Sequence, residues 1–454
     1  MELAIPGQVE HIIEQLGENG YEAFAVGGCV RDLLLGRTPE DWDITTSARP
    51  EDVKRIFRRT IDTGIEHGTV TVMIGETGYE VTTYRVDGEY EDHRHPKAVQ
   101  FTAELVEDLR RRDFTINAMA YAPGSGVIDV FSGREDMEKG MIRAVGVAHE
   151  RFEEDALRML RAVRFSGQLG FRIEGKTKQA ICELAHTISH VSVERIRVEL
   201  TKLLLSREPE RLLEAYEAGL TKIILPEFDQ MIETEQENPH HYLNVGRHTL
   251  AVIKQINHLA KREQLDKKQW VALCFAGLLH DVSKPECKTV DRDGIAHFYG
   301  HDKKGSERAG HILRRLKFDN YTIDFVKRLV NYHDERFEGG KKSLRRIMNR
   351  MGREYVPYLF LLQEADLLGQ STYMQQEKLG ALGHAKILYG QINEADEAVS
   401  LSDLAIGGKE LMELGIRKGP EIGKMLNELM SIVLEEPQKN KPEILVAIVK
   451  ERIG

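Results

Sequence analysis

The segment Gly27-Gly28-Cys29-Val30-Arg31-Asp32-Leu33-Leu34-Leu35-Gly36-Arg37, followed closely by Asp41-Trp42-Asp43, decides the fold of the first part of this chain. A pair of glycines predicts a tight turn whose exposed backbone N–H groups can bind phosphate. Two aspartates separated by one residue place both carboxylates on the same side of a strand. A phosphate-binding turn beside paired carboxylates is what magnesium-dependent nucleotidyl transfer requires.

The residues around this segment predict a sheet-containing head and a helical remainder. Short stretches rich in β-branched and aromatic residues and punctuated by glycine predict strands; they are Glu22–Val26, Asp41–Thr45, Thr69–Ile74, Tyr79–Arg85 and Val99–Thr102. A polar loop is expected between the last two, at Asp87–Pro96. From about Arg151 onward apolar residues recur at helical spacing. The expected fold class is therefore α+β, with a mixed sheet followed by an all-helical remainder.

Composition indicates a reduced, cytoplasmic protein. The 454 residues are 41% hydrophobic and 30% charged, and no apolar run approaches the length that spans a bilayer. The first twenty residues lack a signal-peptide pattern, and the four cysteines are widely scattered. The net charge of −10 argues mildly against a nucleic-acid partner. Local basic segments such as Arg110-Arg111-Arg112 nevertheless leave that partner open.

Asp41 and Asp43 are the candidate catalytic residues. Carboxylates in this arrangement can hold two Mg²⁺ ions about 3.5–4 Å apart, which activate the attacking hydroxyl and stabilise the leaving pyrophosphate. Gly28 would let the backbone approach the triphosphate, and Arg31 could pair with it. Glu80, on a later strand of the same sheet, is a further candidate for a third carboxylate.

These residues resemble the class II tRNA nucleotidyltransferases, the family that contains CCA-adding enzymes and bacterial poly(A) polymerases. Four further motifs follow in the family's order, at Arg111–Ala118, Asp129–Arg143, Glu154–Phe171 and Ser192–Glu199. The resemblance implies that Arg112 lies against the nucleotide. It also implies that Asp155 and Arg158 recognise the base.

The chemistry of Asp155 and Arg158 fits that implied role. If both lie on one helix, a spacing of three puts them on the same face. A carboxylate can accept from the exocyclic amine of cytosine or adenine, and an arginine can donate to the adjacent ring nitrogen. CTP and ATP would then be selected without a template. Arg161 and Arg164 continue the spacing and are suited to meeting phosphate.

A second group of residues predicts a metal site in the helical part of the chain. His248, His280-Asp281 and Asp366 follow the ligand order of an HD phosphohydrolase domain, and His301 and His333 occupy the positions of further ligands. The metal could be Ni, Mn, Co or Mg. Some relatives in the resembled family carry such a domain, and their example implies activity on terminal or 2′,3′-cyclic phosphates.

The resemblance implies four parts: a nucleotidyltransferase head (1–145), a helical neck that recognises the base and binds RNA (146–225), an HD metal-binding domain (226–380) and a tRNA-binding tail (381–454). The implied function is addition of C, C and A to the 3′ end of tRNA from CTP and ATP, with Mg²⁺ and a second divalent metal. The long form of the polar loop, with Arg94 and Pro96, favours CCA or A addition over CC addition alone.

Three alternatives stay open at this point. One is addition of A alone, or poly(A) synthesis, on the same scaffold. Another is a metal phosphohydrolase whose head only recruits RNA. The third is a non-catalytic RNA-binding protein, which the intact pair of head carboxylates disfavours.

Overall fold

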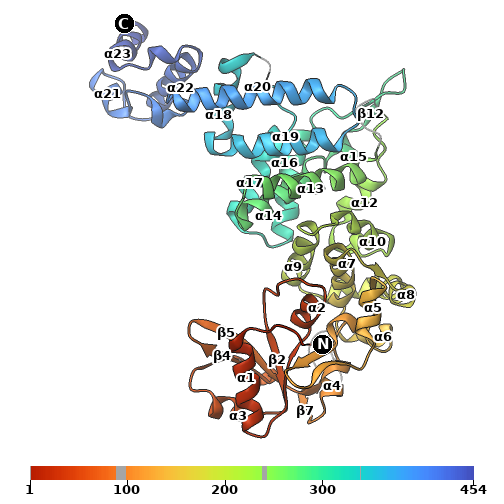
Figure 1. Ribbon diagram of the computed structural model, residues 1–454. Coiled ribbons are helices and arrows are strands. Elements are labelled where there is room, and N and C mark those ends of the chain that lie inside the picture. The colour runs from red at the N-terminus through yellow and green to blue at the C-terminus, as the bar shows by residue number, and fades with distance from the viewer. Residues whose placement is uncertain (1, 88–98, 238–242, 338, 454) are drawn as a thin grey trace. The chain divides into compact units, whose positions relative to one another are not determined.

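The computed structural model describes residues 2–87, 99–237, 243–337 and 339–453. The chain forms two compact units, Met1–Pro226 and Glu227–Gly454 (Figure 1). The polar loop expected at Asp87–Pro96 falls almost entirely outside the described residues. Among the residues described, no helix is long and apolar enough to cross a membrane.

The first unit is built on a seven-stranded mixed sheet. In spatial order its strands are β3 (Thr60–Gly64), β4 (Thr69–Ile74), β5 (Thr77–Thr83), β2 (Asp43–Thr46), β1 (Ala23–Val26), β8 (Met119–Ala122) and β9 (Gly126–Asp129). Strands β2 and β5 run parallel, and the other neighbours run antiparallel. A separate antiparallel pair joins β6 (Arg85–Asp87) to β7 (Val99–Phe101). The predicted mixed-sheet head is confirmed.

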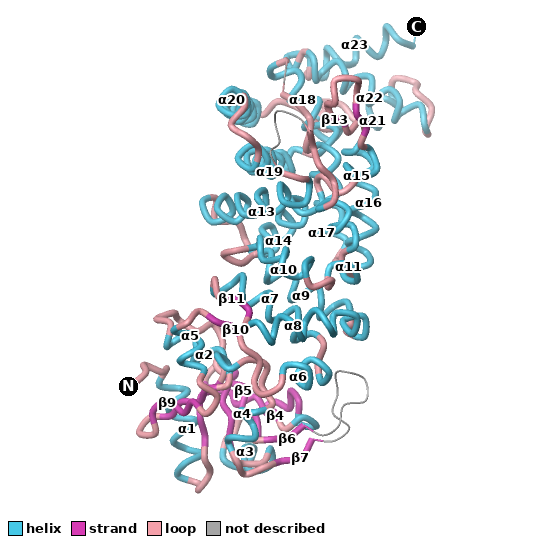
Figure 2. Tube along the Cα trace, turned by 90° about the vertical axis from the view of Figure 1, so that its right-hand side faces the viewer, coloured by secondary structure: helices cyan, strands magenta, loops and turns pink. Residues whose placement is uncertain are grey.

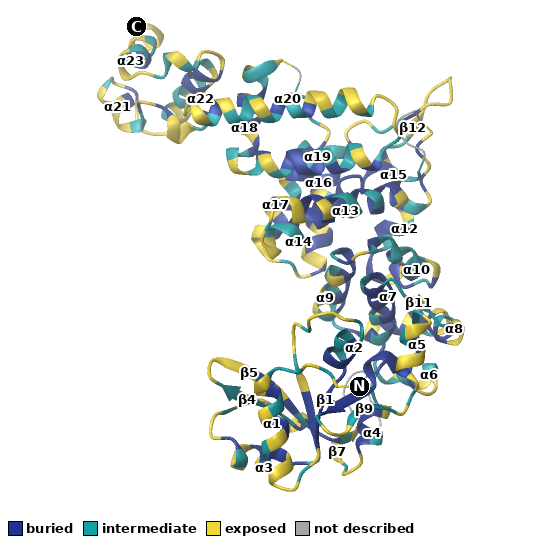
Figure 3. Ribbon diagram, in the orientation of Figure 1, coloured by how far each residue is buried: buried dark blue, intermediate teal, exposed yellow. Residues whose placement is uncertain are grey.

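The core of the head explains why these segments become strands. All four residues of β1 and of β8 are buried, as central strands require (Figure 3). Helix α1 (Gly7–Glu18) adds Val9, Ile12, Ile13 and Leu16 to the same hydrophobic core. The sequence analysis missed β3, β8 and β9, because short strands beside glycine-rich turns carry little periodicity.

Helices make up most of the remainder of the first unit. They are α2 (Gly28–Leu34), α3 (Pro50–Ile56), α4 (Leu105–Arg110), α5 (Gly133–Glu138), α6 (Ala148–Glu154), α7 (Leu157–Leu169), α8 (Gly175–Leu184), α9 (Val193–Leu204), α10 (Leu212–Glu217), α11 (Thr221–Ile224) and, across the unit boundary, α12 (Pro226–Ile232). Strand β10 (Met141–Ile142) pairs in parallel with β11 (Arg172–Ile173).

Among its described residues, the second unit has helices and one short hairpin (Figure 2). Its helices are α13 (Val245–Arg262), α14 (Lys267–Leu279), α15 (Lys284–Cys287), α16 (His301–Arg315), α17 (Asn320–Tyr332), α18 (Gly340–Met351), α19 (Val356–Gly369), α20 (Gln375–Glu394), α21 (Gly408–Glu413), α22 (Pro420–Glu435) and α23 (Pro442–Ile453). The hairpin pairs β12 (Thr289–Val290) with β13 (Ala296–His297). The expectation of an all-helical remainder is thus wrong at β11 and at this hairpin, because two-residue strands are too short to show a sequence pattern.

Candidate functional site

The glycine pair forms the turn between β1 and α2. Gly27 has φ +83°, a conformation that side chains disfavour, and α2 begins at Gly28. A Cβ at residue 27 would lie 2.9 Å from Nη1 of Arg112, whereas one at residue 28 would meet only Nη2 of Arg31, at 3.7 Å. The sequence predicted that Gly28 lets the backbone approach the triphosphate. The contacts inside the protein show instead that residue 27 is the position that must be glycine.

Three carboxylates meet at one end of the parallel strand pair. Strand β2 begins at Asp43, and its register pairs Asp43 with Glu80 of β5. Asp43 keeps contact with solvent, but the surrounding protein desolvates its carboxylate. This desolvation, together with repulsion by Asp41, raises the pKa of Asp43, although Arg112 acts in the opposite direction. Burial, Asp43 and Asp41 raise the pKa of Glu80. The mutual repulsion of these acids is what a bound cation would relieve.

The expectation that Asp41 and Asp43 lie on one strand is wrong, since Asp41 precedes β2. The two carboxylates still interact, as the pKa of Asp43 indicates. The turn before the strand, rather than its pleat, therefore positions Asp41.

Two arginines border the glycine turn, and both are oriented by acceptors on neighbouring elements. Arg31 donates from Nη1 to Oδ1 of Asn117 at 2.7 Å and from Nε to Oδ1 of Asp32 at 2.9 Å. Arg112 lies 3.4 Å from Oδ2 of the buried Asp108. Both guanidinium groups are thus directed by protein contacts before any ligand arrives.

Asp108 is an orienting carboxylate that the sequence analysis missed. It is fully buried, and its Oδ1 accepts from Nη2 of Arg111 at 2.7 Å while Oδ2 accepts from Thr45 at 3.1 Å. Burial alone would raise its pKa, but Arg111 and Arg112 outweigh burial and lower it. The sequence did contain a signal for this role: an acidic residue on a short amphipathic helix, four positions before Arg112.

Asp155 and Arg158 do not share a helix, contrary to the prediction. Helix α6 ends at Glu154, Asp155 is extended (φ −145°, ψ 101°), and α7 begins at Leu157. The reason is local: Oδ1 of Asp155 accepts from the backbone N–H of Leu157 at 3.1 Å, a side-chain-to-backbone turn that competes with continuation of α6.

Both proposed base-recognition side chains already have partners in the neck. Arg195 of α9 donates to Oδ2 of Asp155 at 2.7 Å and to Oδ1 at 3.2 Å. Arg158 donates to Glu154 at 2.5 Å and to the carbonyl of Arg111 at 2.9 Å. The sequence analysis assigned no role to Arg195, because a contact across 40 residues leaves no local signal.

Arg161 and Arg164 lie in internal ion pairs. Nη2 of Arg161 is 2.6 Å from Oδ2 of Asp113, and Nε of Arg164 is 2.5 Å from Oε2 of Glu199. Arg164 is buried, and burial lowers its pKa to about 10. The structure therefore uses Arg164 to join α7 to α9, and does not place it at a surface where phosphate would arrive.

Asp113 gives the first unit a pH-dependent contribution to stability. Burial would raise its pKa, but Arg161 and Asn117 outweigh burial and lower it to about 2. The carboxylate therefore stabilises the fold above its ordinary pKa, and this contribution is lost as pH falls from about 4 towards 2. We expect Asp113→Asn to lower the free energy of unfolding by about 2 kcal/mol at pH 7, with a difference that shrinks below pH 4.

Urea unfolding followed by circular dichroism between pH 3 and pH 7 measures that difference. Asp62→Asn, at an exposed position of β3, serves as the control for an unburied carboxylate. A stability difference for Asp113→Asn that stays constant down to pH 3 would contradict the assignment.

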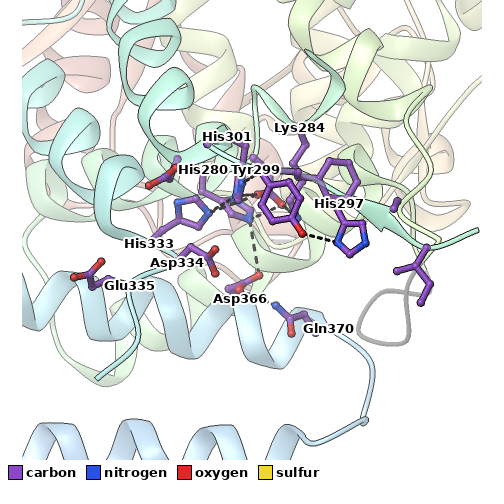
Figure 4. Close-up of a pocket in the computed structure, with 16 residues that line it drawn as sticks. His280, Lys284, His297, Tyr299, His301, His333, Asp334, Glu335, Asp366 and Gln370 are labelled. Atoms are coloured by element: carbon purple, nitrogen blue, oxygen red, sulfur yellow. Dashed lines mark hydrogen bonds and ion pairs between the residues drawn. The ribbon is translucent and has the colours of Figure 1, made fainter. Parts of the chain in front are cut away.

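The second unit gathers the predicted histidines and aspartates from separate helices (Figure 4). His248 lies on α13, His301 begins α16 and Asp366 lies on α19; His280 and His333 directly follow α14 and α17. Oδ1 of Asp366 lies 2.8 Å from Nε2 of His248 and 3.8 Å from Nε2 of His280. The structure thus brings all the proposed ligands to one place.

All four imidazoles have the same orientation relative to the backbone. Each directs Nδ1 at a carbonyl oxygen: His280 at Gly277 (2.8 Å), His301 at Phe298 (2.7 Å), His333 at Val330 (2.7 Å) and His248 at Gly369 (3.3 Å). Because a carbonyl only accepts, Nδ1 must carry the proton. Nε2 of each ring is thus directed at the centre of the cluster, which is the orientation of metal-ligating histidines.

Asp281 lies between two groups of donor atoms. Its Oδ2 is 3.1 Å from Nε2 of His280 and 3.9 Å from that of His248. Its Oδ1 is 3.5 Å from Nε2 of His301 and 3.6 Å from that of His333. The donor atoms of each triad lie within 4.8 Å of one another. Each triad could hold one divalent cation, and Asp281 belongs to both triads.

The polar atoms at the centre of the cluster also fit bound metal. Asp281 is buried, and Nζ of Lys284 lies 2.8 Å from its Oδ2, whereas Oδ1 and Nε2 of His280 have no hydrogen-bond partner among the described residues. Burial would raise the pKa of Asp281, but His280 and Lys284 outweigh burial and hold it well below its ordinary range. A buried carboxylate oxygen that lacks a hydrogen bond, as Oδ1 does, would be stabilised by a cation beside it.

Three family models match the chain and define the class of protein. The poly A polymerase head domain matches residues 23–143. The "Probable RNA and SrmB-binding site of polymerase A" matches residues 170–232, and domain 2 of tRNA nucleotidyltransferases matches residues 295–449. The fold and the head site therefore define a nucleotidyltransferase of the poly(A) polymerase and tRNA nucleotidyltransferase class.

Relatives place the chain within that class. The CCA-adding enzyme of Lactococcus lactis is 34% identical over 98% of this chain and 97% of its own. That of Lactiplantibacillus plantarum is 54% identical over 47% of this chain and 51% of its own. A crystal structure of the Bacillus stearothermophilus CCA-adding enzyme with CTP matches 99% of this chain and 98% of its own, with a TM-score of 0.74 and 30% identity. The chain belongs to the CCA-adding enzymes, a family of tRNA nucleotidyltransferases.

Proposed function

We propose that the head adds C, C and A to the 3′ end of tRNA, with CTP and ATP as substrates. The observation that carries this proposal is the cluster of Asp41, Asp43 and Glu80 in the same head as the Gly27 turn and Arg112. Support for the substrates comes from relatives solved with CTP, and, for the Thermotoga maritima enzyme, with tRNA.

Asp41 and Asp43 are the proposed Mg²⁺ ligands, and Glu80 is a third carboxylate beside them. Mg²⁺ bound there would lower the pKa of the attacking hydroxyl and offset the charge of the leaving pyrophosphate. The backbone at Gly28 and the guanidinium groups of Arg31 and Arg112 would hold the triphosphate. Because Asp108 and Asn117 orient those arginines in advance, the triphosphate would meet a preorganised site.

Base selection is assigned to Asp155 and Arg158. Cytosine and adenine share an exocyclic amine next to a ring acceptor, which matches one carboxylate and one guanidinium. Asp155 can keep its contact with Arg195 while a free lone pair accepts from the base. Arg158 uses three of its five N–H donors on Glu154 and the carbonyls of Arg111 and Arg151, so it has donors left for the base.

We expect Asp155→Ala to relax base selection more than it weakens triphosphate binding. Loss of one discriminating hydrogen-bond acceptor corresponds to roughly 1–3 kcal/mol of discrimination against the wrong base. Misincorporation of UTP and GTP, measured as kcat/KM relative to CTP and ATP, should rise by the corresponding factor of about 5 to 150. Arg195→Lys is the companion variant, since it keeps a cation beside Asp155 and should preserve selectivity better than Arg195→Ala. Unchanged selectivity in Asp155→Ala would refute the role.

One gel assay distinguishes the possible activities of the head. A tRNA that lacks its CCA end is incubated with CTP, ATP or both, and the added nucleotides are counted. CCA addition predicts two nucleotides with CTP alone and three with both substrates. Addition of A only to a tRNA that already ends in CC would identify an A-adding enzyme, and a long A tract would identify a poly(A) polymerase.

We further propose that the histidine–aspartate cluster is the metal site of an HD-type phosphohydrolase. The four inward-directed Nε2 atoms, and Asp281 between them, support binding of two divalent cations. Bound metal would supply a hydroxide at neutral pH and polarise the phosphate. Lys284, whose Nζ lies 2.8 Å from Oδ2 of Asp281, would contribute a positive charge beside the phosphate. Release of phosphate from 2′,3′-cyclic or terminal phosphates, and its loss in His280→Ala, tests the proposal.

A further inference from the structure

A cavity of about 540 Å³ opens beside the histidine–aspartate cluster and has an aromatic wall (Figure 4). Tyr299 lines it and is 78% exposed, although it is a large aromatic residue. Its ring is stacked on that of His297, with centroids 5.4 Å apart and planes only 6° from parallel. His297 thus covers one face of the tyrosine, while most of the ring is open to solvent.

Asp291 orients His297, and the hydroxyl of Tyr299 lies 3.4 Å from Nδ1 of that histidine. Oδ2 of Asp291 lies 2.9 Å from Nε2 of His297, and Oδ1 accepts from the backbone N–H groups of Asp293 (3.0 Å) and Ile295 (2.9 Å). These hydrogen bonds, that of His297 first, lower the pKa of Asp291, so it stays ionised. The hairpin therefore presents the Tyr299 ring as a prearranged surface, which lowers the entropic cost of stacking a ligand on it.

The same wall of the cavity carries phosphate-binding chemistry. The segment from His297 to His301 contains both the aromatic pair and a proposed metal ligand, and Gly300, with φ +74°, makes the turn between them. Lys284 also lines the cavity, and Nζ is held 2.8 Å from Asp281 and 2.9 Å from Gln236. An ammonium has three donors, so one remains for a ligand oxygen.

We propose that this cavity is a nucleotide subsite in which a base stacks on Tyr299 while its phosphate reaches Lys284 and the cluster. The inference rests on the proposed phosphohydrolase and adds its substrate class. A cavity of this volume suits a small ligand, and a flat aromatic face accepts any base. The carboxylates of Asp302, Asp334 and Glu335 also line it and would repel a continuing phosphate backbone. The occupant is therefore one terminal nucleotide.

The test compares ligands with and without a base in the full-length protein. Cytidine 3′-monophosphate and a tRNA ending in a 3′-phosphate carry the base, and ribose 5-phosphate does not. Two quantities are measured: KM for phosphate release with metal, and the Kd of cytidine 3′-monophosphate without metal, by saturation-transfer NMR. The variants are Tyr299→Ala, Tyr299→Phe and Val290→Ala, the last an exposed control on the same hairpin.

We expect Tyr299→Ala to raise KM and Kd for the base-containing ligands by about 5- to 150-fold, the range for one stacked base. Ribose 5-phosphate should be unaffected, Tyr299→Phe should retain binding, and Val290→Ala should behave as the parent protein. CCA addition should be unchanged in every variant, which separates this subsite from nucleotide binding in the head. An effect on the tRNA alone would assign the subsite to RNA ends, and an effect on both ligands would extend it to free nucleotides.

The remaining outcomes distinguish the two proposals. If Tyr299→Ala leaves both KM and Kd unchanged while phosphate is released, the subsite is refuted and the phosphohydrolase stands. If no ligand is hydrolysed but Kd rises in Tyr299→Ala, the phosphohydrolase is refuted and the subsite stands.

Discussion

Asp43→Ala is expected to abolish incorporation of both CTP and ATP while tRNA binding stays largely intact. Asp43 begins β2, lies in register with Glu80, and belongs to the cluster of carboxylates whose repulsion a cation would relieve. Deleting one group that stabilises transition-state charge costs a factor on the order of 10²–10³. Loss of a metal ligand should lower kcat by at least that factor, and the effect should not lie in the KM for tRNA.

Single-turnover extension of tRNA lacking its CCA end measures the chemical step, and filter binding measures tRNA affinity. Asp62→Ala removes an exposed carboxylate from β3 of the same sheet and should retain full activity. Asp43→Asn keeps the volume but not the charge and should be nearly as inactive as Asp43→Ala. If Asp43→Ala still incorporates CTP and ATP, Asp43 is not a metal ligand.

Asp281→Ala is expected to release metal from the second unit without affecting nucleotide addition. Its two oxygens face the two histidine pairs, so a single substitution removes a ligand from both triads. A supporting residue around a metal contributes about 10- to 100-fold in affinity, and a shared ligand should contribute more. Metal content after dialysis, measured by elemental analysis, should fall from two ions per chain to none, together with phosphate release.

Because Lys284 would lose its buried partner in Asp281→Ala, the variant could unfold locally. Asp281→Asn, which keeps the volume and one oxygen ligand, gives the second measurement: it should weaken metal binding while the thermal unfolding midpoint stays closer to that of the parent. Asp324→Ala, at an exposed position of α17, controls for loss of an aspartate. Full metal content in both Asp281 variants would contradict the bridging role.

The head shows which parts of a site can be predicted from sequence. The glycine pair and the two aspartates are close in the chain, and the constraints on them are local: a turn that needs positive φ, and carboxylates near a strand terminus. Asp108 and Arg195 were missed because their roles arise from contacts with Arg112 and Asp155 on other elements. The helical assignment of Asp155 failed because a local hydrogen bond from its side chain to the backbone of Leu157 competed with the helix.

In the helical unit, too, sequence predicts only part of the site, and the residues concerned lie farther apart along the chain. Order along the chain, matched to the ligand order of an HD phosphohydrolase domain, was enough to nominate six candidate ligands between His248 and Asp366. Their orientation could not be predicted. Each imidazole is oriented by a backbone carbonyl, three of them by the carbonyl three residues earlier, where α14 and α17 end and α16 begins.

The sequence by itself determined the α+β class and the glycine turn with its paired aspartates, because these depend on residue type and short-range spacing, and it nominated the candidate metal ligands by their order along the chain. Tertiary structure alone decided which acids and arginines meet, which oxygen of Asp281 faces which histidines, and that Tyr299 stands stacked beside the cluster. The physical reason is that hydrogen bonds, ion pairs and desolvation act over a few ångströms in space. Only the packing of helices and strands brings residues tens or hundreds of positions apart within that range.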